Sequence, residues 1–178
     1  NPYRGKVEIP ATVNGLPVTE VDGLAMYACY YLKELVIGDN VKKCGHEAFG
    51  ASINLCNVTL PVADVEFTHN WMFNCDRGIR EIHCRSSIPY VVEEGIFNGA
   101  VDYDKCILYV PVGTKQAYRN AEVWKYFTHI VEEYVSTSIS NINVEKKSVW
   151  YTLQGVKLFA KPNIPGVYIH NGKKIIVR

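Results

Sequence analysis

Three side chains in the first hundred residues have the types and the spacing that a metal site requires. His46 and His69 lie 23 positions apart, and Glu93 follows 24 positions later. If the chain repeats at this interval, the three residues stand on adjacent rungs with Cα atoms about 5 Å apart. Imidazole and carboxylate groups bind zinc and other borderline metals. The alternative, which we favour, is that polar residues simply occupy the exposed first position of each helical turn. Gly23 occupies that position one rung earlier.

No familiar catalytic pattern occurs elsewhere in the sequence. The chain lacks a G-x-S-x-G nucleophile turn, an H-E-x-x-H zinc helix, a phosphate-binding loop and a C-x-x-C pair. Adjacent acids occur at Glu93-Glu94 and Glu132-Glu133, but neighbouring surface carboxylates are usually solvated and do not form an acid–base pair. We therefore predict that the chain is not an enzyme and uses no cofactor.

The composition narrows the class of protein further. The 178 residues are 48% hydrophobic and 21% charged, with a formal net charge of +1. Such a chain can bury an ordinary core. Its near-neutral charge gives no electrostatic reason to bind nucleic acid or an anionic membrane. No apolar run approaches the roughly 20 residues of a membrane span. We expect neither a nucleic-acid partner nor a membrane span, while the oligomeric state stays open.

A repeat of about two dozen residues runs through residues 7–110. A bulky apolar residue recurs at Met26, Phe49, Met72 and Ile96, which are 23, 23 and 24 positions apart. Pairs of apolar residues separated by one residue recur as well: the middle three pairs keep this interval, and the outer two lie 28 and 26 residues away. These pairs are Val7/Ile9, Leu35/Ile37, Val58/Leu60, Ile82/Cys84 and Leu108/Val110. Several columns that share one offset are the signature of a solenoid of stacked coils, each with one short strand and one helical turn.

Four segments of this repeat carry a family resemblance. They are VEIPATVNGLPVTEV (7–21), HEAF (46–49), NVTLP (57–61) and LYVPVGTKQAY (108–118). They resemble the BspA-like leucine-rich repeats of Bacteroidetes surface proteins. The resemblance covers residues 3–133. The third coil departs from the pattern, because residues 61–73 lack the usual isoleucine–glycine step and the A-F pair, and we expect a bulge there.

The resemblance has implications for both fold and function. It implies a mainly β fold with short helical turns, a right-handed leucine-rich-repeat solenoid of about five coils. BspA-like proteins are associated with adhesion to host proteins and to other bacteria. The resemblance therefore implies an exported protein at the cell surface or in the extracellular space. Its expected partner is a host or bacterial surface protein or a glycan.

Residues 111–133 break the strand pattern and predict a helical cap. Thr114 can act as the N-cap of a short helix at 115–121. The side chains that can cover the last coil are Tyr118, Trp124, Phe127 and Ile130. An open solenoid end would expose its core, so we favour capping over an aromatic ligand platform. The solenoid with its cap is predicted to span residues 1–133.

The composition changes at Ser136 to a polar strip, and two predicted hairpins follow. VWYTLQGVKLFA (149–160) and PGVYIHNGKKIIVR (165–178) each contain two strands around a turn, and Asn171-Gly172 favours a type I′ turn. This tail resembles a short C-terminal β-module of exported Bacteroidetes proteins, some of which use it as a sorting signal. We predict a small antiparallel β-module at residues 134–178.

The repeat also argues against disulfides among the six cysteines. Cys29 and Cys75 share a column but lie two coils apart, about 10 Å at strand spacing, which exceeds the limit of about 7 Å for a bridge. Cys44 and Cys84 replace inward apolar residues of the preceding coils. We predict six free thiols, most of which act as small buried hydrophobes.

Aromatic residues near the turns are the remaining candidates for function. Tyr30 and Tyr31 come just before the predicted strand at Leu32, and Trp71 falls near the same columns in the third coil. Such residues either complete the core or act as rigid anchors for a partner. We assign two other aromatic residues, Phe73 and Phe97, to the core.

The preferred interpretation is a noncatalytic module that binds protein or another macromolecule across the solenoid face. The first alternative is a passive spacer or display scaffold. The second is the metal site on the column of His46 and His69. A large exposed aromatic patch would favour binding, and a uniformly polar surface would favour the scaffold.

Overall fold

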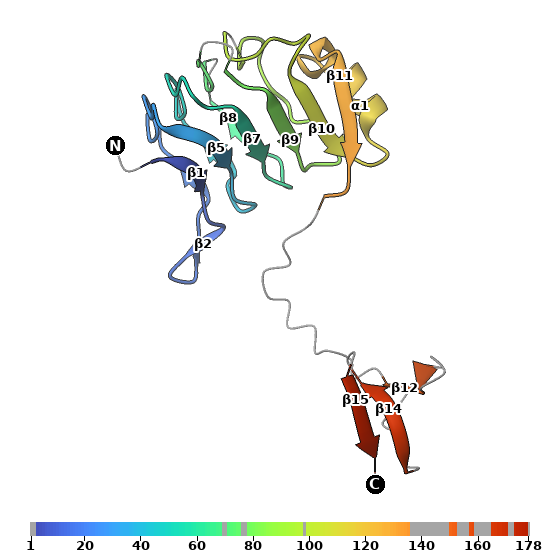
Figure 1. Cartoon of the computed structure of the whole chain (residues 1–178). Helices are drawn as coiled ribbons and strands as arrows, with labels where there is room; N and C mark the ends of the chain where they lie inside the picture. The colour runs from blue at the N-terminus through green and yellow to red at the C-terminus, as the bar shows by residue number, and fades with distance from the viewer. Residues whose placement is uncertain are drawn as a thin grey trace. The chain divides into compact units, whose positions relative to one another are not determined.

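The computed structural model separates the chain into two compact units, Asn1–Ser136 and Thr137–Arg178, which we describe separately. The residues that the structure describes are 3–68, 71–75, 78–97, 99–135, 150–152, 157–158, 165–170 and 173–177. The first unit is a β-solenoid of about five coils, and its coils follow one another in chain order (Figure 1).

A six-stranded parallel sheet forms one side of the solenoid, with one strand from each coil and a last strand from the cap region. Its strands are β1 (Gly5–Glu8), β5 (Leu32–Val36), β7 (Asn57–Leu60), β9 (Glu81–Cys84), β10 (Ile107–Pro111) and β11 (His129–Glu133). A second parallel sheet of two-residue strands consists of β4 (Glu20–Val21), β6 (Lys43–Cys44) and β8 (Glu66–Phe67). The first coil also carries a small hairpin of β2 (Thr12–Val13) and β3 (Leu16–Pro17).

The register of the large sheet confirms the repeat. The leading residue of each predicted apolar pair lies opposite the leading residue of the next pair. This inner row contains Val7, Leu35, Val58, Ile82 and Leu108 and continues to Ile130. Strands β7 and β9 alternate between buried and half-buried residues, so each strand directs one face into the core.

The four bulky residues predicted to form one column are all buried, but the single column is wrong at the third coil. Phe49 stacks on Phe73 and not on Met72, because the third coil is one residue longer. Met26, Phe49, Met72 and Ile96 are each at most 8% exposed. The Met26 amide donates to the carbonyl of Ala48 at 2.7 Å, which links the first two helical turns. Burying each of these side chains contributes roughly 1.5–3 kcal/mol. Because no coil can bury its own face, this stabilisation depends on the neighbouring coils.

A ladder of aromatic rings runs along the same core. Phe49 stacks on Phe73 with ring centroids 5.6 Å apart, and Phe73 stacks on Phe97 at 5.7 Å. Trp124 meets the last ring edge-on at 5.5 Å, and its indole N–H donates to the carbonyl of Tyr90 at 2.8 Å. The assignment of Phe73 and Phe97 to the core is confirmed, since both rings are fully buried.

The cap contains helix α1 (Lys115–Asn120) and the 3-10 turn η1 (Trp124–Tyr126). The four side chains predicted to cover the last coil, Tyr118, Trp124, Phe127 and Ile130, are all buried. Among the described residues, no helix is long and apolar enough to cross a membrane.

Two details of the predicted cap are wrong. Thr114 makes no side-chain capping bond, because its hydroxyl donates back to the carbonyl of Pro111 at 2.7 Å. His129–Glu133 forms β11 and extends the sheet, although no strand was expected within residues 111–133. The sequence signal was weak there, since Ile130 is the only buried residue of β11.

The third coil is one residue longer than the second, in keeping with its predicted departure. Cys44 lies opposite Phe67, which gives an offset of 23, whereas Val58 lies opposite Ile82, which gives 24. In the turns, Ala28 donates to a carbonyl 22 positions ahead, but Ala51 donates to that of Asn74, 23 positions ahead. The added residue therefore falls between Phe67 and Asn74.

All six cysteines are free thiols, and five of them are buried. Burial raises the pKa of the Cys44 and Cys106 thiols to about 12, and it raises that of Cys84 well above its usual value. A thiol that stays protonated is a poor nucleophile. These side chains therefore act as small hydrophobes, as the repeat predicts.

The second unit contains a four-stranded antiparallel sheet in the order β13-β12-β14-β15. Its strands are β12 (Trp150–Thr152), β13 (Lys157–Leu158), β14 (Gly166–His170) and β15 (Lys173–Val177). These are the two predicted hairpins, joined through pairing of β12 with β14. The predicted turn at Asn171-Gly172 lies outside the described residues.

Candidate functional site

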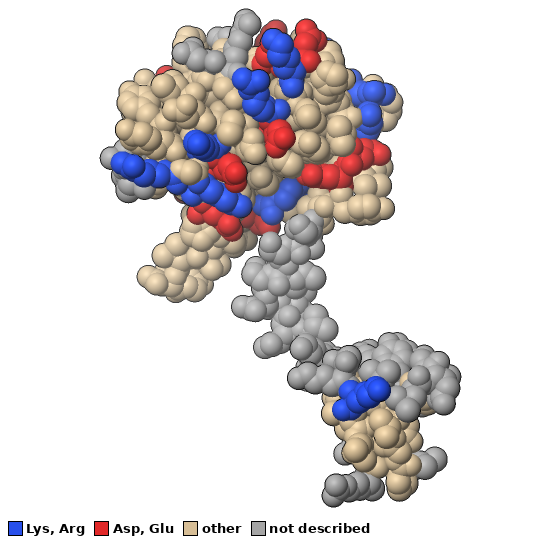
Figure 2. All heavy atoms as spheres, in the orientation of Figure 1, with Lys and Arg blue, Asp and Glu red and all other residues tan. Residues whose placement is uncertain are grey.

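Two surfaces of the solenoid carry the candidate residues. We call the outward side chains of the six-stranded sheet the sheet face. One of its rows contains Glu34, Asn57, Glu81 and Ile107, and the next contains Thr59, His83 and Tyr109. Neighbours in a row stand about 4.8 Å apart. Acidic and basic side chains lie next to one another over these strands (Figure 2).

His83 is the centre of a polar cluster on the sheet face. Its ring stacks on Tyr109 with centroids 4.4 Å apart and planes at 4°. Its Nδ1 lies 2.8 Å from a carboxylate oxygen of Glu133, and its Nε2 lies 3.8 Å from that of Glu81. These contacts fix the ring between three neighbouring strands. The cluster therefore joins β9, β10 and β11, a role that the sequence did not reveal.

Arg85 makes a second cross-coil link at the end of β9. Its guanidinium lies 2.6 Å from Asp39 and donates to the carbonyls of Ile37 at 3.2 Å and Leu60 at 3.1 Å. Its side chain is only 15% exposed. One side chain thus ties three coils together. Like His83, Arg85 is engaged within the protein rather than presented to a ligand.

The second surface is formed by the turns that precede the strands. We call the described residues of 22–31, 45–54, 71–79 and 91–100 the turn edge. The predicted binding residues Tyr30, Tyr31 and Trp71 are 52%, 55% and 47% exposed here. Tyr27 is also exposed, and its ring lies over Gly50 of the next coil, 3.2 Å from the position a Cβ would take. The exposure of these residues is established, and their role in binding remains a prediction.

The backbone at the turn edge bends the same way at one position of each of four coils. Leu24, Glu47, Trp71 and Gly95 have φ angles of 60°, 47°, 80° and 99°. This left-handed conformation costs non-glycine residues roughly 1–3 kcal/mol, and Gly95 adopts it without that strain. Trp71 and Leu24 are nevertheless large, apolar and exposed. Neither core packing nor backbone geometry accounts for such side chains at this corner.

The residues of the predicted metal site are partly placed by the structure. His46 is exposed next to Gly23, as the shared column predicts, and its Nε2 lies 3.3 Å from a carboxylate oxygen of Glu47. Glu93 is exposed. His69 lies outside the described residues. The described residues contain no group of three potential ligands, so the proposed His46/His69/Glu93 site stays a prediction.

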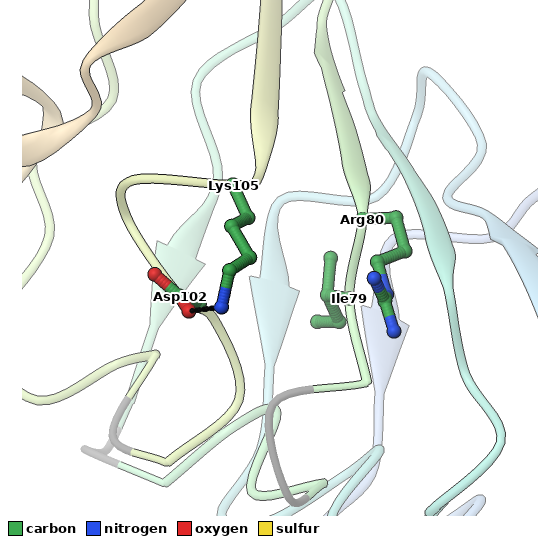
Figure 3. Close-up of a pocket in the computed structure, with 4 residues that line it drawn as sticks. All are labelled: Ile79, Arg80, Asp102 and Lys105. Atoms are coloured by element: carbon green, nitrogen blue, oxygen red, sulfur yellow. Dashed lines mark hydrogen bonds and ion pairs between the residues drawn. The ribbon is translucent and has the colours of Figure 1, made fainter.

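A small hollow lies between the fourth and fifth coils (Figure 3). Ile79, Arg80, Asp102 and Lys105 line it, and the Lys105 ammonium lies 2.8 Å from the Asp102 carboxylate. This set combines one ion pair with one further cation and an apolar wall. It contains no imidazole, thiol or hydroxyl group that could act as a nucleophile or base beside the pair, so the hollow does not suggest a reaction.

Comparison with known proteins adds one likeness. No protein-family model matches the sequence, and no curated protein matches it. The crystal structure of a leucine-rich repeat protein of T. pallidum, TpLRR, is 15% identical; the match covers 74% of this chain and 86% of that chain, with a TM-score of 0.30. The class of the fold rests on its own strand register. It is a β-solenoid of about five stacked coils.

Proposed function

We propose that this chain is an exported, noncatalytic module of the BspA-like type that binds a protein or another macromolecule at the cell surface. The observation that carries the proposal is the exposure of Tyr30, Tyr31 and Trp71 on one edge of a rigid solenoid. The sequence segments that resemble Bacteroidetes surface repeats support the location. The partner is a host or bacterial surface protein or a glycan.

Binding would use contact area rather than chemistry. Tyrosine and tryptophan bury large surfaces on binding and lose little side-chain entropy, because each has only two side-chain torsions. The coils that hold Tyr30 and Trp71 are fixed by the aromatic ladder and by the backbone bonds between turns. A partner would therefore meet a preformed surface, which lowers the ordering cost of association.

The full-length chain on an array of surface proteins and glycans tests this proposal. We expect one or more ligands to bind the wild type and to lose at least about tenfold in affinity with Tyr30→Ala/Trp71→Gly, since aromatic anchors dominate binding energy. Tyr126→Ala, an exposed tyrosine on the cap, is the matched control and should leave binding unchanged. If Tyr30→Ala/Trp71→Gly binds its ligand with wild-type affinity, the turn edge is not the binding site.

The passive scaffold is a second candidate, and the sheet face favours it. His83 on this face contacts Glu133 of another coil, and Arg85 and Asp39 form a cross-coil pair just beyond the ends of β9 and β5, so part of its charge serves to join the coils. The absence of binding to every ligand on the arrays would support the scaffold. Surface biotinylation of intact cells tests the location, because an exported surface protein is labelled without lysis.

The metal site needs its own test. Elemental analysis of the purified chain, with and without His69→Ala, measures whether zinc or a related metal is bound. Stoichiometric metal that disappears in the variant would establish the His46/His69/Glu93 column as a ligand set. Metal-free wild-type protein after exposure to zinc would end that hypothesis.

A further inference from the structure

We infer that the turn edge receives a cationic protein segment, whose arginine or lysine side chains lie on its exposed aromatic rings and face its carboxylates. This inference rests on the proposed function and adds the chemistry of the partner. It depends on three observations: the charge of the turn edge, its exposed rings and a cation–ring contact within the chain itself.

The described residues of the turn edge include several acids and no Lys or Arg, although the Arg4 guanidinium reaches Tyr31 from outside the edge and His46 is exposed beside Glu47. Residues 22–31, 45–54 and 91–100 contain no Lys or Arg, although the chain has 19 of them. The same segments contain Asp22, Glu47, Glu93 and Glu94. Three of these acids are exposed and Glu47 is half-buried. In the third turn segment, Asp76 and Arg77 lie outside the described residues.

This charge bias distinguishes the turn edge from the neighbouring sheet face. Basic and acidic side chains lie next to one another over the strands in Figure 2. An exposed surface with more acids than cations attracts positive ligands and repels negative ones. A nucleic acid, a sulfated glycan or an acidic peptide is therefore the wrong partner for this edge.

Exposed aromatic rings give the same preference a contact geometry. A guanidinium or ammonium group within about 6 Å of an aromatic ring centroid is attracted by the ring's electron-rich face. Tyr31 already makes this contact within the chain, because the guanidinium carbon of Arg4 lies 4.6 Å from its ring centroid. Among the described residues, no side-chain hydrogen bond or ion pair engages Tyr27, Tyr30 or Trp71. These three rings are available for cations from a partner.

The left-handed corners of successive coils place a carboxylate next to an aromatic ring. Leu24, Glu47 and Trp71 occupy the corresponding left-handed corner of three successive coils, so they follow one another at about 4.8 Å per coil. A carboxylate thus stands between an aliphatic and an aromatic side chain. A segment that combines basic with apolar or small residues fits this order best.

Calorimetry with defined probes tests the inference on the full chain at pH 7.5. The probes are a 12-residue peptide of alternating arginine and threonine, its glutamate–threonine counterpart and neutral maltohexaose. We expect the arginine peptide alone to bind, with an affinity that falls several-fold between 50 and 300 mM NaCl, because exposed charges are screened by salt. Equal binding of the glutamate peptide, or binding of maltohexaose only, would overturn the inference.

Variants locate the binding on the turn edge. Trp71→Gly should weaken binding of the arginine peptide about tenfold, and Glu47→Gln/Glu94→Gln should weaken it about threefold with a smaller salt dependence. Glu34→Gln, which removes a carboxylate from the sheet face, is the matched control and should change nothing. If Glu34→Gln weakens binding and Trp71→Gly does not, the cationic site is elsewhere and the inference is wrong.

The inference and the proposed function can fail separately. If the arginine peptide does not bind while an array ligand requires Tyr30 and Trp71, the partner is not cationic and the binding function stands. If no array ligand requires these residues and the arginine peptide also fails to bind, both are wrong.

Discussion

The sheet face and the turn edge come from the same repeat but use their side chains in different ways. On the sheet face, polar groups contact other coils, as His83 does with Glu133 and Arg85 with Asp39. At the turn edge, large aromatic side chains are about half exposed. One surface therefore carries contacts between coils, while the other carries large side chains that are half exposed.

The backbone sharpens this difference. Apart from Gly5, no described strand residue of the sheet face has a positive φ angle, whereas Leu24, Glu47 and Trp71 hold left-handed corners at the turn edge. Strained backbone at exposed residues is a common feature of binding sites. Glycine, as found at Gly95, would form the same corner with less strain. For this reason we propose the turn edge, rather than the sheet face, as the binding surface.

The largest effect should come from the core that both surfaces share. Phe73→Ala removes a ring that stacks on Phe49 and Phe97 and should lower the free energy of unfolding by about 4 kcal/mol. Urea denaturation measures it. Tyr126→Ala on the cap surface should cost less than about 0.5 kcal/mol, and an equal loss for both variants would contradict the ladder.

The next effect tests how closely the coils approach. A Cβ on Gly45 would lie 2.4 Å from the amide nitrogen of Gly23, whereas one on Gly50 would meet the movable ring of Tyr27 at 3.2 Å. Gly45→Ala should lower the free energy of unfolding by about 2–3 kcal/mol. Gly50→Ala should have a much smaller effect. Thermal melting of both variants measures the difference, and equal melting temperatures would show that the backbones are not in contact.

A smaller effect separates the paired sheet face from ordinary surface charge. Asp39→Ala leaves the largely buried Arg85 guanidinium without its carboxylate and should cost about 1 kcal/mol. Glu122→Ala breaks the exposed pair with Lys125 and should be neutral within error. Urea denaturation compares the two, and a neutral Asp39→Ala would mean that this face does not stabilise the stack.

The smallest effect on stability should occur at the turn edge. Trp71→Gly removes an exposed side chain and relieves a left-handed corner, so the free energy of unfolding should stay the same or rise by up to about 1 kcal/mol. A loss of more than about 1 kcal/mol would show that Trp71 is part of the packing. That result would remove the contrast between the two surfaces.

Much of this organisation could be predicted from the sequence because the same apolar pair recurs in every coil. The inner row from Val7 to Leu108 follows from these pairs, which lie 23 to 28 positions apart. The sixth strand was missed because Ile130 is its single buried residue. The Thr114 cap was wrong because the preceding turn offers its hydroxyl a closer carbonyl acceptor.

The side-chain clusters were harder to predict, for a physical reason. His83 meets Tyr109 across an offset of 26, and Glu133 lies 24 positions beyond Tyr109, so no single period brings the three together. Of the four left-handed corners, only the one at Gly95 has a glycine, the residue type that would have predicted a positive φ angle. Tyr30, Tyr31 and Trp71 could be identified as candidates because they are aromatic and lie in the turns that precede the predicted strands.

A double-mutant cycle on Phe49 and Phe73 tests most directly whether residues about two dozen positions apart are neighbours. The stacked rings, with centroids 5.6 Å apart, predict a coupling of about 1 kcal/mol between the two alanine substitutions in urea denaturation. Phe49 and Phe127, which are separated by several coils, should give additive losses within about 0.5 kcal/mol. Additive losses for Phe49 and Phe73 would contradict the stacked register and both surfaces that depend on it.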